Sequence, residues 1–431
     1  MASTLAQQMA VAIAPKFTAG LSTLGSIATI FLILRRRTPG NNGNGSGNTG
    51  GGGGGGRSRR YSNERGRGHG TYHRLVLGMS VCCLSSSVAW FFTTWPIPRD
   101  TTGVYGAIGT QRTCTAQGFF AQFSLSSVMY NASLSVYYAL VIVYGWTERR
   151  IVSIEPYIHL HAISWGLFTG IACIGLGLFN QVGWDCWISA YPIGCAETWK
   201  NRNSVGDDIT TTTTTTCTRG DNGSIYQWAF YYAPLWVVII VVMLLMRSVY
   251  TSVRRQEMVM ERGQFILNDD RDRLKKSRQI AIQAAYYVGA FYVTWFFPTI
   301  FQIVLVTSGE VYFPLLILTA FFVPIQGLLN LIVFVRPKYG RYLRNNPDQS
   351  MILAWFRMLS DELGGRGNGS SEPAVPSARR CSSRFSWRPS YLKRSSTEEI
   401  SMDKRPAAAP DSVAAEKLED GQEIALNHDD T

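Results

Sequence analysis

Seven long apolar stretches alternate with polar connections along this chain. They begin near Val11, Leu75, Cys114, Tyr157, Tyr226, Ile280 and Val311. Most run for about 20 residues or more, which is the length a helix needs to cross ~30 Å of hydrocarbon. Because a membrane interior offers no water to peptide groups, each stretch has to be helical. The pattern therefore predicts an all-α membrane protein, built as a seven-transmembrane helix bundle.

The predicted crossings divide the chain into a bundle at 13–336, its connections and its two ends. The crossings cover about 13–34, 74–95, 114–144, 157–180, 226–247, 279–306 and 311–335. The other segments are a short extracellular amino end at 1–12, a flexible Gly/Arg-rich cytoplasmic loop at 35–73, a second outer loop at 181–225, a membrane-surface helix at 337–345 and a disordered cytoplasmic tail at 346–431.

Basic residues are concentrated in alternate connections. Charged residues make up 16% of the chain, below the ~25% usual in soluble domains, and the net charge is +12. Arginine is dense in the first, third and fifth connections, around Arg57, Arg149 and Arg254. Since Lys/Arg-rich loops stay in the cytoplasm, the amino end is predicted outside and the carboxyl end inside. The basic charge then indicates topology and attraction to anionic membrane lipid, not nucleic-acid binding.

Four cysteines fall on the predicted outer side. They are Cys114, Cys186, Cys195 and Cys217. Four cysteines permit three pairings, and their spacing does not choose among them. Disulfides are favoured over free thiols because the outer side is oxidising. In the second outer loop, Asn222-Gly223-Ser224 is a sequon that predicts N-glycosylation at Asn222.

The crossings lack the residues that chemistry or ion transport requires. Charged groups are almost absent, whereas transport proteins keep them along an ion pathway. The seventh crossing has no lysine for a retinal Schiff base. His159 and His161 are two residues apart and point in different directions on a helix, which makes a poor metal site. No nucleophile, base and orienting group occur together, so we expect neither an enzyme nor a cofactor.

Neutral polar side chains and prolines fill the crossings instead. Such side chains hydrogen-bond between helices, and prolines favour kinks that serve as hinges. The prolines are Pro234, Pro298 and Pro324, in the fifth, sixth and seventh crossings. These features are together typical of a bundle that switches between arrangements, although static packing is the better explanation for any single polar residue. Gly166 and Gly170 form a small-xxx-small pair that permits dimerisation.

Four motifs carry a family resemblance over about residues 74–345. They are Cys114 with Gln117-Gly118-Phe119-Phe120, Cys186-Trp187-Ile188, Thr294-Trp295-Phe296-Phe297-Pro298 and Gln326-Gly327-Leu328-Leu329-Asn330. In order and depth they resemble G protein-coupled receptors, nearest to the secretin-like and cAMP-receptor-like branch. The resemblance implies a Cys114–Cys186 disulfide, which leaves Cys195 and Cys217 as the second pair. It also implies a conformational switch at Trp295, Pro298, Gln326 and Asn330.

The same resemblance implies a multi-pass plasma-membrane receptor that relays an extracellular signal to a heterotrimeric G protein. The large hormone-binding ectodomain of secretin receptors is missing, so we expect a small ligand. The expected G protein contacts are Arg149, Arg150, Arg254, Arg255, Lys275 and Lys276, and the expected phosphorylation sites are Ser382, Ser395 and Ser396. The alternative is a seven-helix transporter or channel. It predicts a polar path or two related halves, and neither is visible.

Overall fold

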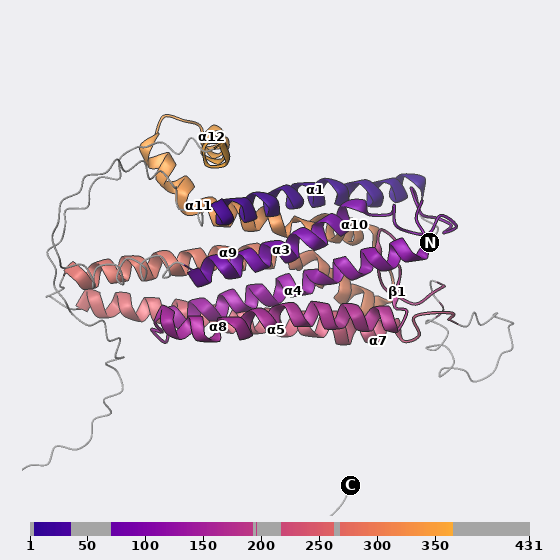
Figure 1. Ribbon diagram of the computed structural model, residues 1–431, viewed down its shortest axis with the longest axis horizontal. Helices are drawn as coiled ribbons and strands as arrows, with labels where there is room; N and C mark the ends of the chain where they lie inside the picture. The colour runs from indigo at the N-terminus through magenta and orange to yellow at the C-terminus, as the bar shows by residue number, and fades with distance from the viewer. Residues whose placement is uncertain (1–3, 36–69, 193–194, 196–216, 263–267, 365–431) are drawn as a thin grey trace, which may run out of the picture. The chain divides into compact units, whose positions relative to one another are not determined.

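The structure, a computed structural model, describes residues 4–35, 70–192, 195, 217–262 and 268–364. The chain divides into two compact units, and every described residue belongs to the first of them, Met1–Phe385. Within the described ranges, seven helical spans are long and apolar enough to cross a membrane (Figure 1). They confirm the predicted seven-helix bundle and make the chain a multi-pass membrane protein.

Most of the described spans are single helices, and two spans change helix type along their length. The single helices are α1 (Leu5–Arg35), α3 (Gly70–Phe92), α4 (Gln111–Ile142), α5 (Glu148–Gly175) and α9 (Asn268–Ser308). The fifth span comprises α7 (Gly223–Gln227), the π-helical turn η2 (Trp228–Tyr232) and α8 (Ala233–Arg262). The seventh comprises α10 (Phe313–Phe322), the 3₁₀ turn η3 (Val323–Ile325) and α11 (Gln326–Asn345). The connection between α5 and α7 holds the antiparallel hairpin β1 (Phe179–Gln181) and β2 (Cys186–Ile188), and its first residues lie within the predicted fourth crossing. Helix α12 (Met351–Gly364) follows the last span.

Helix α4 is the centre of the bundle. It packs against α3, α5, α8, α9 and both strands. In its most apolar stretch 72% of residues are buried, against 28% in α5. Helix α5 instead exposes large apolar side chains such as Leu160 and Phe168, as expected where a helix faces hydrocarbon. The architecture therefore has one largely buried helix, α4, with the other spans packed against it.

The glycine pair predicted to permit dimerisation is used inside the bundle. Gly166 and Gly170 are both buried. A Cβ atom added at Gly170 would lie 3.0 Å from the Phe119 ring of α4, and one added at Gly166 would meet the Ser126 side chain. The two glycines thus allow α5 to approach α4 closely in the same chain, and this face is not free for a second copy.

The three prolines act differently. Pro324 lies in the 3₁₀ turn η3, which separates α10 from α11. Pro234 is the second residue of α8, directly after the π-helical turn η2. At both positions the helix type changes next to the proline, because proline removes a backbone hydrogen bond and a neighbouring turn adjusts. Pro298, by contrast, lies inside α9 with no change of helix type.

The ends of the bundle differ from the predicted boundaries. Helix α1 begins at Leu5, inside the segment expected as a free amino end, and the Ala12 carbonyl accepts a hydrogen bond from the Thr93 hydroxyl at 3.0 Å. The segment 337–345 is helical but forms the last turns of α11, which continues through Pro337. The separate helix is α12, within the segment expected to be a disordered tail. The loop at 36–69 and the tail beyond 364 lie outside the described residues.

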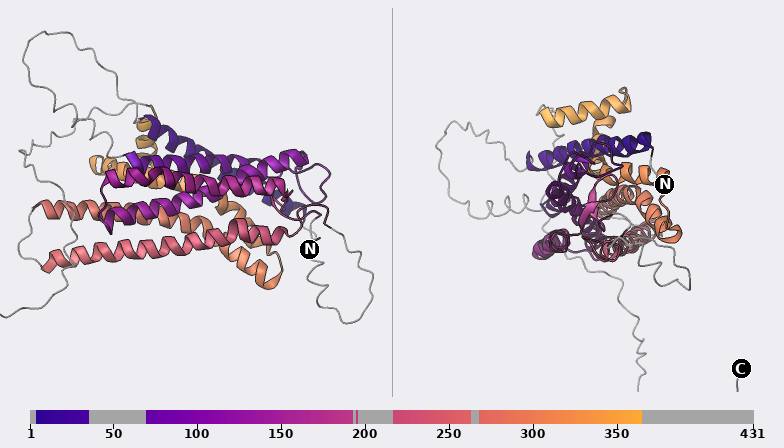
Figure 2. Two further views of the ribbon diagram at one scale, coloured as in Figure 1. Left: turned by 60° about the horizontal axis from the view of Figure 1, so that its bottom comes forward. Right: turned by 90° about the vertical axis from the view of Figure 1, so that its right-hand side faces the viewer.

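Helix α12 is attached to the end of the bundle and lies across its axis (Figures 1 and 2). Lys338 of α11 forms an ion pair with Glu362, and the Tyr339 hydroxyl donates to the Met351 carbonyl at 3.0 Å. One face of α12 is buried, and the other exposes apolar side chains such as Phe356. An amphipathic helix in this orientation suits a membrane surface. The segment 337–345 is thus no separate helix, and a membrane-surface position for α12 stays a prediction.

Candidate functional site

The hairpin of the second outer loop is fastened to the first turns of α4. A disulfide joins Cys114 to Cys186, with the two Cα atoms 5.2 Å apart. The Cys186 amide donates to the Gln117 side chain at 3.0 Å. The Trp187 indole donates to the Gln122 side chain at 2.9 Å. Strand β2 is therefore held along α4 by one covalent bond and two hydrogen bonds. We call this end of the bundle the disulfide end.

A run of aromatic contacts leads from the hairpin to α9. The Trp187 ring lies 4.9 Å from Tyr231 and 5.7 Å from Tyr232, both edge-on. The Tyr231 hydroxyl is 2.8 Å from the Ser124 hydroxyl of α4. The Tyr231 ring in turn lies 5.8 Å from Trp295, one of the predicted switch residues. Two ring contacts thus connect the outer loop to α9.

A buried carboxylate lies beside this path. Asp185, directly before β2, is 5% exposed. Burial raises the pKa of Asp185 to about 7, and a hydrogen bond from the Trp90 indole opposes this only in part. The neighbouring Trp184 packs among apolar side chains of α1, α3 and α10. The loop therefore carries a carboxyl group whose charge changes near neutral pH.

Two of the predicted switch residues have buried donors without partners. In the described part of the chain, neither the Trp295 indole nor the Gln326 side-chain amide meets a hydrogen-bond acceptor. Leaving a buried donor unpaired costs about 1–3 kcal/mol. Such groups are available to a ligand or to another arrangement of the helices. Asn330 is different, because its amide nitrogen lies 3.5 Å from the Cys83 sulfur, which is 3.0 Å from the Ser127 hydroxyl.

Neutral contacts hold α9 at the opposite end of the bundle. The Tyr72 and Tyr287 hydroxyls are 3.0 Å apart and join α3 to α9. The Gln283 side chain donates to a backbone carbonyl of α11 at 2.7 Å. The Arg336 guanidinium lies 3.9 Å from the centre of the Tyr286 ring. We call this the tyrosine end.

Charged contacts at the tyrosine end join α3, α4 and α5. Arg74 forms an ion pair with Glu155. Glu155 also accepts a hydrogen bond from the Thr71 hydroxyl at 3.0 Å and lies 3.5 Å from His159. The His159 ring is 2.9 Å from the Tyr130 hydroxyl. The sequence predicts Glu155 near a helix end, but it does not identify Arg74 as its ion-pair partner.

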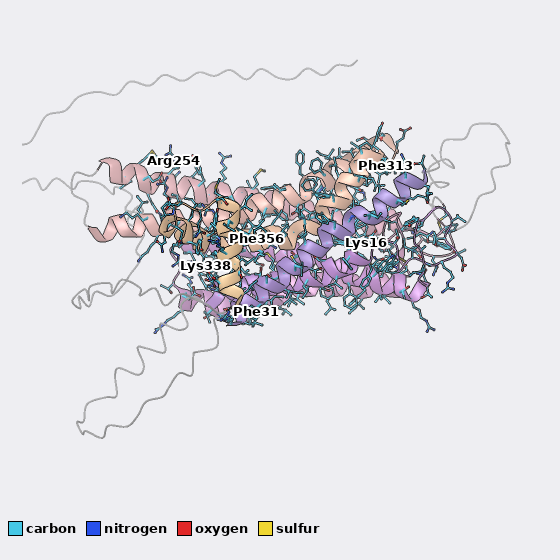
Figure 3. All side chains as sticks on the ribbon, turned by 90° about the horizontal axis from the view of Figure 1, so that it is seen from above. Lys16, Phe31, Arg254, Phe313, Lys338 and Phe356 are labelled. Carbon is cyan, nitrogen blue, oxygen red and sulfur yellow. A yellow bond between two sulfur atoms is a disulfide. The ribbon has the colours of Figure 1, made fainter. Side chains whose placement is uncertain are left out.

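The six expected G protein contacts lie on helix ends at the tyrosine end. They come from the start of α5, the last turns of α8 and the first turns of α9, and all six are exposed. Figure 3 labels Arg254 near this end, away from Lys16 and Phe313. Arg254 lies 3.6 Å from Glu257, which is also 3.8 Å from Arg278 of α9.

The other predicted sites fall in different places. A second disulfide joins Cys195 to Cys217, with 5.2 Å between the Cα atoms. Asn222 is exposed, with φ at +60°, directly before α7. The sites at Ser382, Ser395 and Ser396 lie outside the described residues. Among the residues that the structure covers, no three His, Cys, Asp or Glu side chains are grouped to bind a metal ion.

Comparisons with known proteins add little to this description. No family model matches the chain, and no curated protein does. Among solved structures, the crystal structure of squid rhodopsin is 12% identical and covers 87% of this chain and 94% of its own, with a TM-score of 0.49. At that similarity the likeness carries no inference about this chain. The seven-helix bundle is established by the helices themselves.

Proposed function

We propose that the chain is a plasma-membrane receptor of the G protein-coupled type, with its disulfide end outside the cell. The basic connections at the tyrosine end favour the cytoplasm for that end. The two disulfides favour an oxidising compartment for the other. The exposed sequon at Asn222 lies on the disulfide side as well. These three features agree on one orientation.

The observation that carries this proposal is the run of contacts from β2 to α9. A small extracellular ligand at the disulfide end would touch the hairpin around Trp187 and Asp185. It would activate the receptor by binding one helix arrangement better than another, since equal affinity for both shifts nothing. Trp187, Tyr231 and Trp295 give such a ligand a route of ring contacts to α9.

Movement of the other end of α9 would then expose a cytoplasmic surface. At rest α9 is held there by the Tyr72–Tyr287 hydrogen bond and by Gln283. Release of these contacts would separate the first turns of α9 from α3 and α11. The six exposed basic side chains border this region and would contact the G protein, with Trp295, Pro298, Gln326 and Asn330 changing conformation inside the bundle.

Guanine-nucleotide exchange tests the proposal without knowledge of the ligand. The full chain in lipid nanodiscs would be mixed with a panel of purified heterotrimeric G proteins. We expect basal exchange above empty nanodiscs for at least one subtype, and higher exchange from a variant in which α9 is released. Solute flux in liposomes, with no exchange from any subtype, would instead support a transporter or channel.

Glycosidase treatment tests the orientation separately. If Asn222 is outside and carries a glycan, the enzyme lowers the apparent mass of the chain, and Asn222→Gln has the same effect. An antibody to the carboxyl-terminal tail should stain only permeabilised cells. Staining of intact cells by that antibody would overturn the orientation, and with it the receptor proposal.

A further inference from the structure

A groove opens on the surface of α3 and α4 that faces away from the bundle, near the disulfide end. It encloses about 650 Å³ and is lined by α3, by the connection after it and by the start of α4. Its large side chains are apolar, and Phe92, Trp95 and Phe120 are 42%, 42% and 50% exposed. Phe92 and Phe120 lie on spanning helices, where side chains this apolar and this exposed face hydrocarbon. The groove is therefore open to the membrane and not to the interior of the bundle.

The polar groups of the lining are mostly engaged with the protein itself. The Gln117 side chain donates to two carbonyls at the end of α3 and accepts from the Cys186 amide. The Thr113 hydroxyl lies 2.8 Å from two backbone carbonyl oxygens, to which it donates its one hydrogen, and it accepts from the Thr110 amide at 2.8 Å. Ser85 is the other polar side chain of the lining. A molecule in this groove would contact apolar surface and almost no free hydrogen-bonding group. The groove therefore favours a hydrocarbon chain.

A cation lies at the rim. The Lys16 ammonium of α1 is 3.5 Å from the centre of the Trp95 ring, and Trp95 also lines the groove. Among the described residues, Lys16 has no carboxylate within ion-pairing distance. In Figure 3, Lys16 lies toward the end of the bundle that carries Phe313 and away from Arg254. Tryptophan and lysine side chains in such positions mark the membrane–water interface. The apolar groove is thus capped by one positive charge at headgroup depth.

The length of the groove corresponds to one leaflet. From Leu84 to Phe92 it follows α3 for about 12 Å, at 1.5 Å per residue. Half of a ~30 Å hydrocarbon core is about 15 Å. We propose that this groove binds one glycerophospholipid with an anionic headgroup, its acyl chain between α3 and α4 and its headgroup phosphate at Lys16. The proposal is independent of G protein coupling and holds whether or not the chain is a receptor.

Photo-crosslinking with defined lipids tests this site. The full chain would be placed in nanodiscs with phosphatidylglycerol that carries a diazirine on its acyl chain, irradiated, digested and mapped by mass spectrometry. We expect adducts to concentrate on residues 84–92 and 116–120. Ala116→Trp fills the groove and should lower these adducts at least fivefold. Ile171→Trp, at an exposed site on α5 away from the groove, is the matched control and should leave them unchanged.

The headgroup is tested with a second variant. One basic residue near the membrane surface favours an anionic lipid by ~1 kcal/mol. At 1.36 kcal/mol per factor of ten, this is a preference of about fivefold for an anionic over a neutral headgroup. Lys16→Gln should lower by that factor the ratio of phosphatidylglycerol to phosphatidylcholine adducts in the groove, with total adducts retained. An unchanged ratio would overturn the assignment of an anionic headgroup.

Two other results would overturn the site itself. Adducts spread evenly over all lipid-facing helices, and unaffected by Ala116→Trp, would show ordinary surrounding lipid. Displacement of the phospholipid probe by a sterol at equal concentration would show a sterol site instead. Thermal melting of each variant, compared with the parent chain, ensures that a loss of adducts reflects the groove and not misfolding.

Discussion

Removing the hydroxyl of Tyr287 should release α9 without disturbing the rest of the bundle. Tyr287 is 1% exposed, and its hydroxyl lies 3.0 Å from that of Tyr72 across the α3–α9 boundary. The Tyr287→Phe substitution keeps the ring and its packing. It removes one hydrogen bond that exists only while α9 stays close to α3. The resting arrangement loses this stabilisation, and an arrangement with α9 displaced loses nothing.

The size of the effect follows from the hydrogen bond. Single interhelical hydrogen bonds in membrane bundles average ~0.6 kcal/mol and reach about 1.7 kcal/mol. At 1.36 kcal/mol per factor of ten, the displaced arrangement should become roughly 3 to 18 times more populated. While that arrangement remains the minority, basal signalling should rise by the same factor. Tyr72→Phe removes the same hydrogen bond together with a contact to Tyr138, so it should change signalling in the same direction, and the double variant should not exceed Tyr72→Phe.

Nucleotide exchange on purified G protein, without ligand, measures this change. The matched control is Tyr286→Phe, one residue earlier on α9, whose hydroxyl makes no hydrogen bond to any of the described residues and whose ring contact with Arg336 is kept. The control should leave basal exchange at the parent level. The reasoning fails if Tyr287→Phe leaves exchange unchanged at equal protein level. It also fails if both variants raise exchange by the same factor.

Three further predictions concern the two ends of the bundle. Burial raises the pKa of Asp185 to about 7, so the folded state favours the neutral carboxyl group. The free energy of unfolding should therefore be greatest below about pH 4 and fall by up to ~1.4 kcal/mol per pH unit toward pH 7. Melting curves of Asp185→Asn from pH 4 to 8 should lack this pH dependence of stability. If the variant keeps the pH dependence, another group causes it. Arg74→Ala removes the half-buried guanidinium that pairs with Glu155, so the melting temperature should fall by the equivalent of about 1.5–3 kcal/mol, with partial recovery when Glu155→Gln is added. The paired substitutions Arg254→Glu and Arg255→Glu should reduce nucleotide exchange at unchanged surface expression, and undiminished exchange would remove both residues from the proposed contact.

The spans were predictable because the membrane imposes a simple physical requirement. A stretch of about 20 apolar residues can satisfy its peptide groups inside a membrane only as a helix. The described structure contains seven such spans. Boundaries were less accurate, as at α1, because apolar residues beyond the membrane still pack on neighbours. Ala12 is buried against the end of α3, and nothing in a single sequence reveals that neighbour.

The site was predictable only where a motif carried information. The motifs singled out Trp295 and Gln326, whose buried donors have no partner in the described chain. Pairs such as Arg74 with Glu155 were missed, because each residue alone resembles an ordinary helix-end charge. Their partnership depends on the rotation of α3 against α5, which hydropathy does not encode. Asp185 was missed for a similar reason, since a loop carboxylate is normally solvated and only the fold buries it.

The kinds of contact at the two ends indicate which helix moves. At the disulfide end, a covalent bond and two hydrogen bonds hold β2 to α4. At the tyrosine end, an ion pair and a hydrogen bond to Glu155 hold α3 to α5, and the Tyr130 hydroxyl of α4 contacts His159 beside them. Helix α9 is instead held there by hydrogen bonds between neutral groups at Tyr287 and Gln283, and by one cation–ring contact. Losing a hydrogen bond to a charged group costs about 1.5–3 kcal/mol, against ~0.6 kcal/mol for a neutral interhelical hydrogen bond. A ligand with a few kcal/mol of preference between arrangements would therefore displace α9 before it separated α3 from α5.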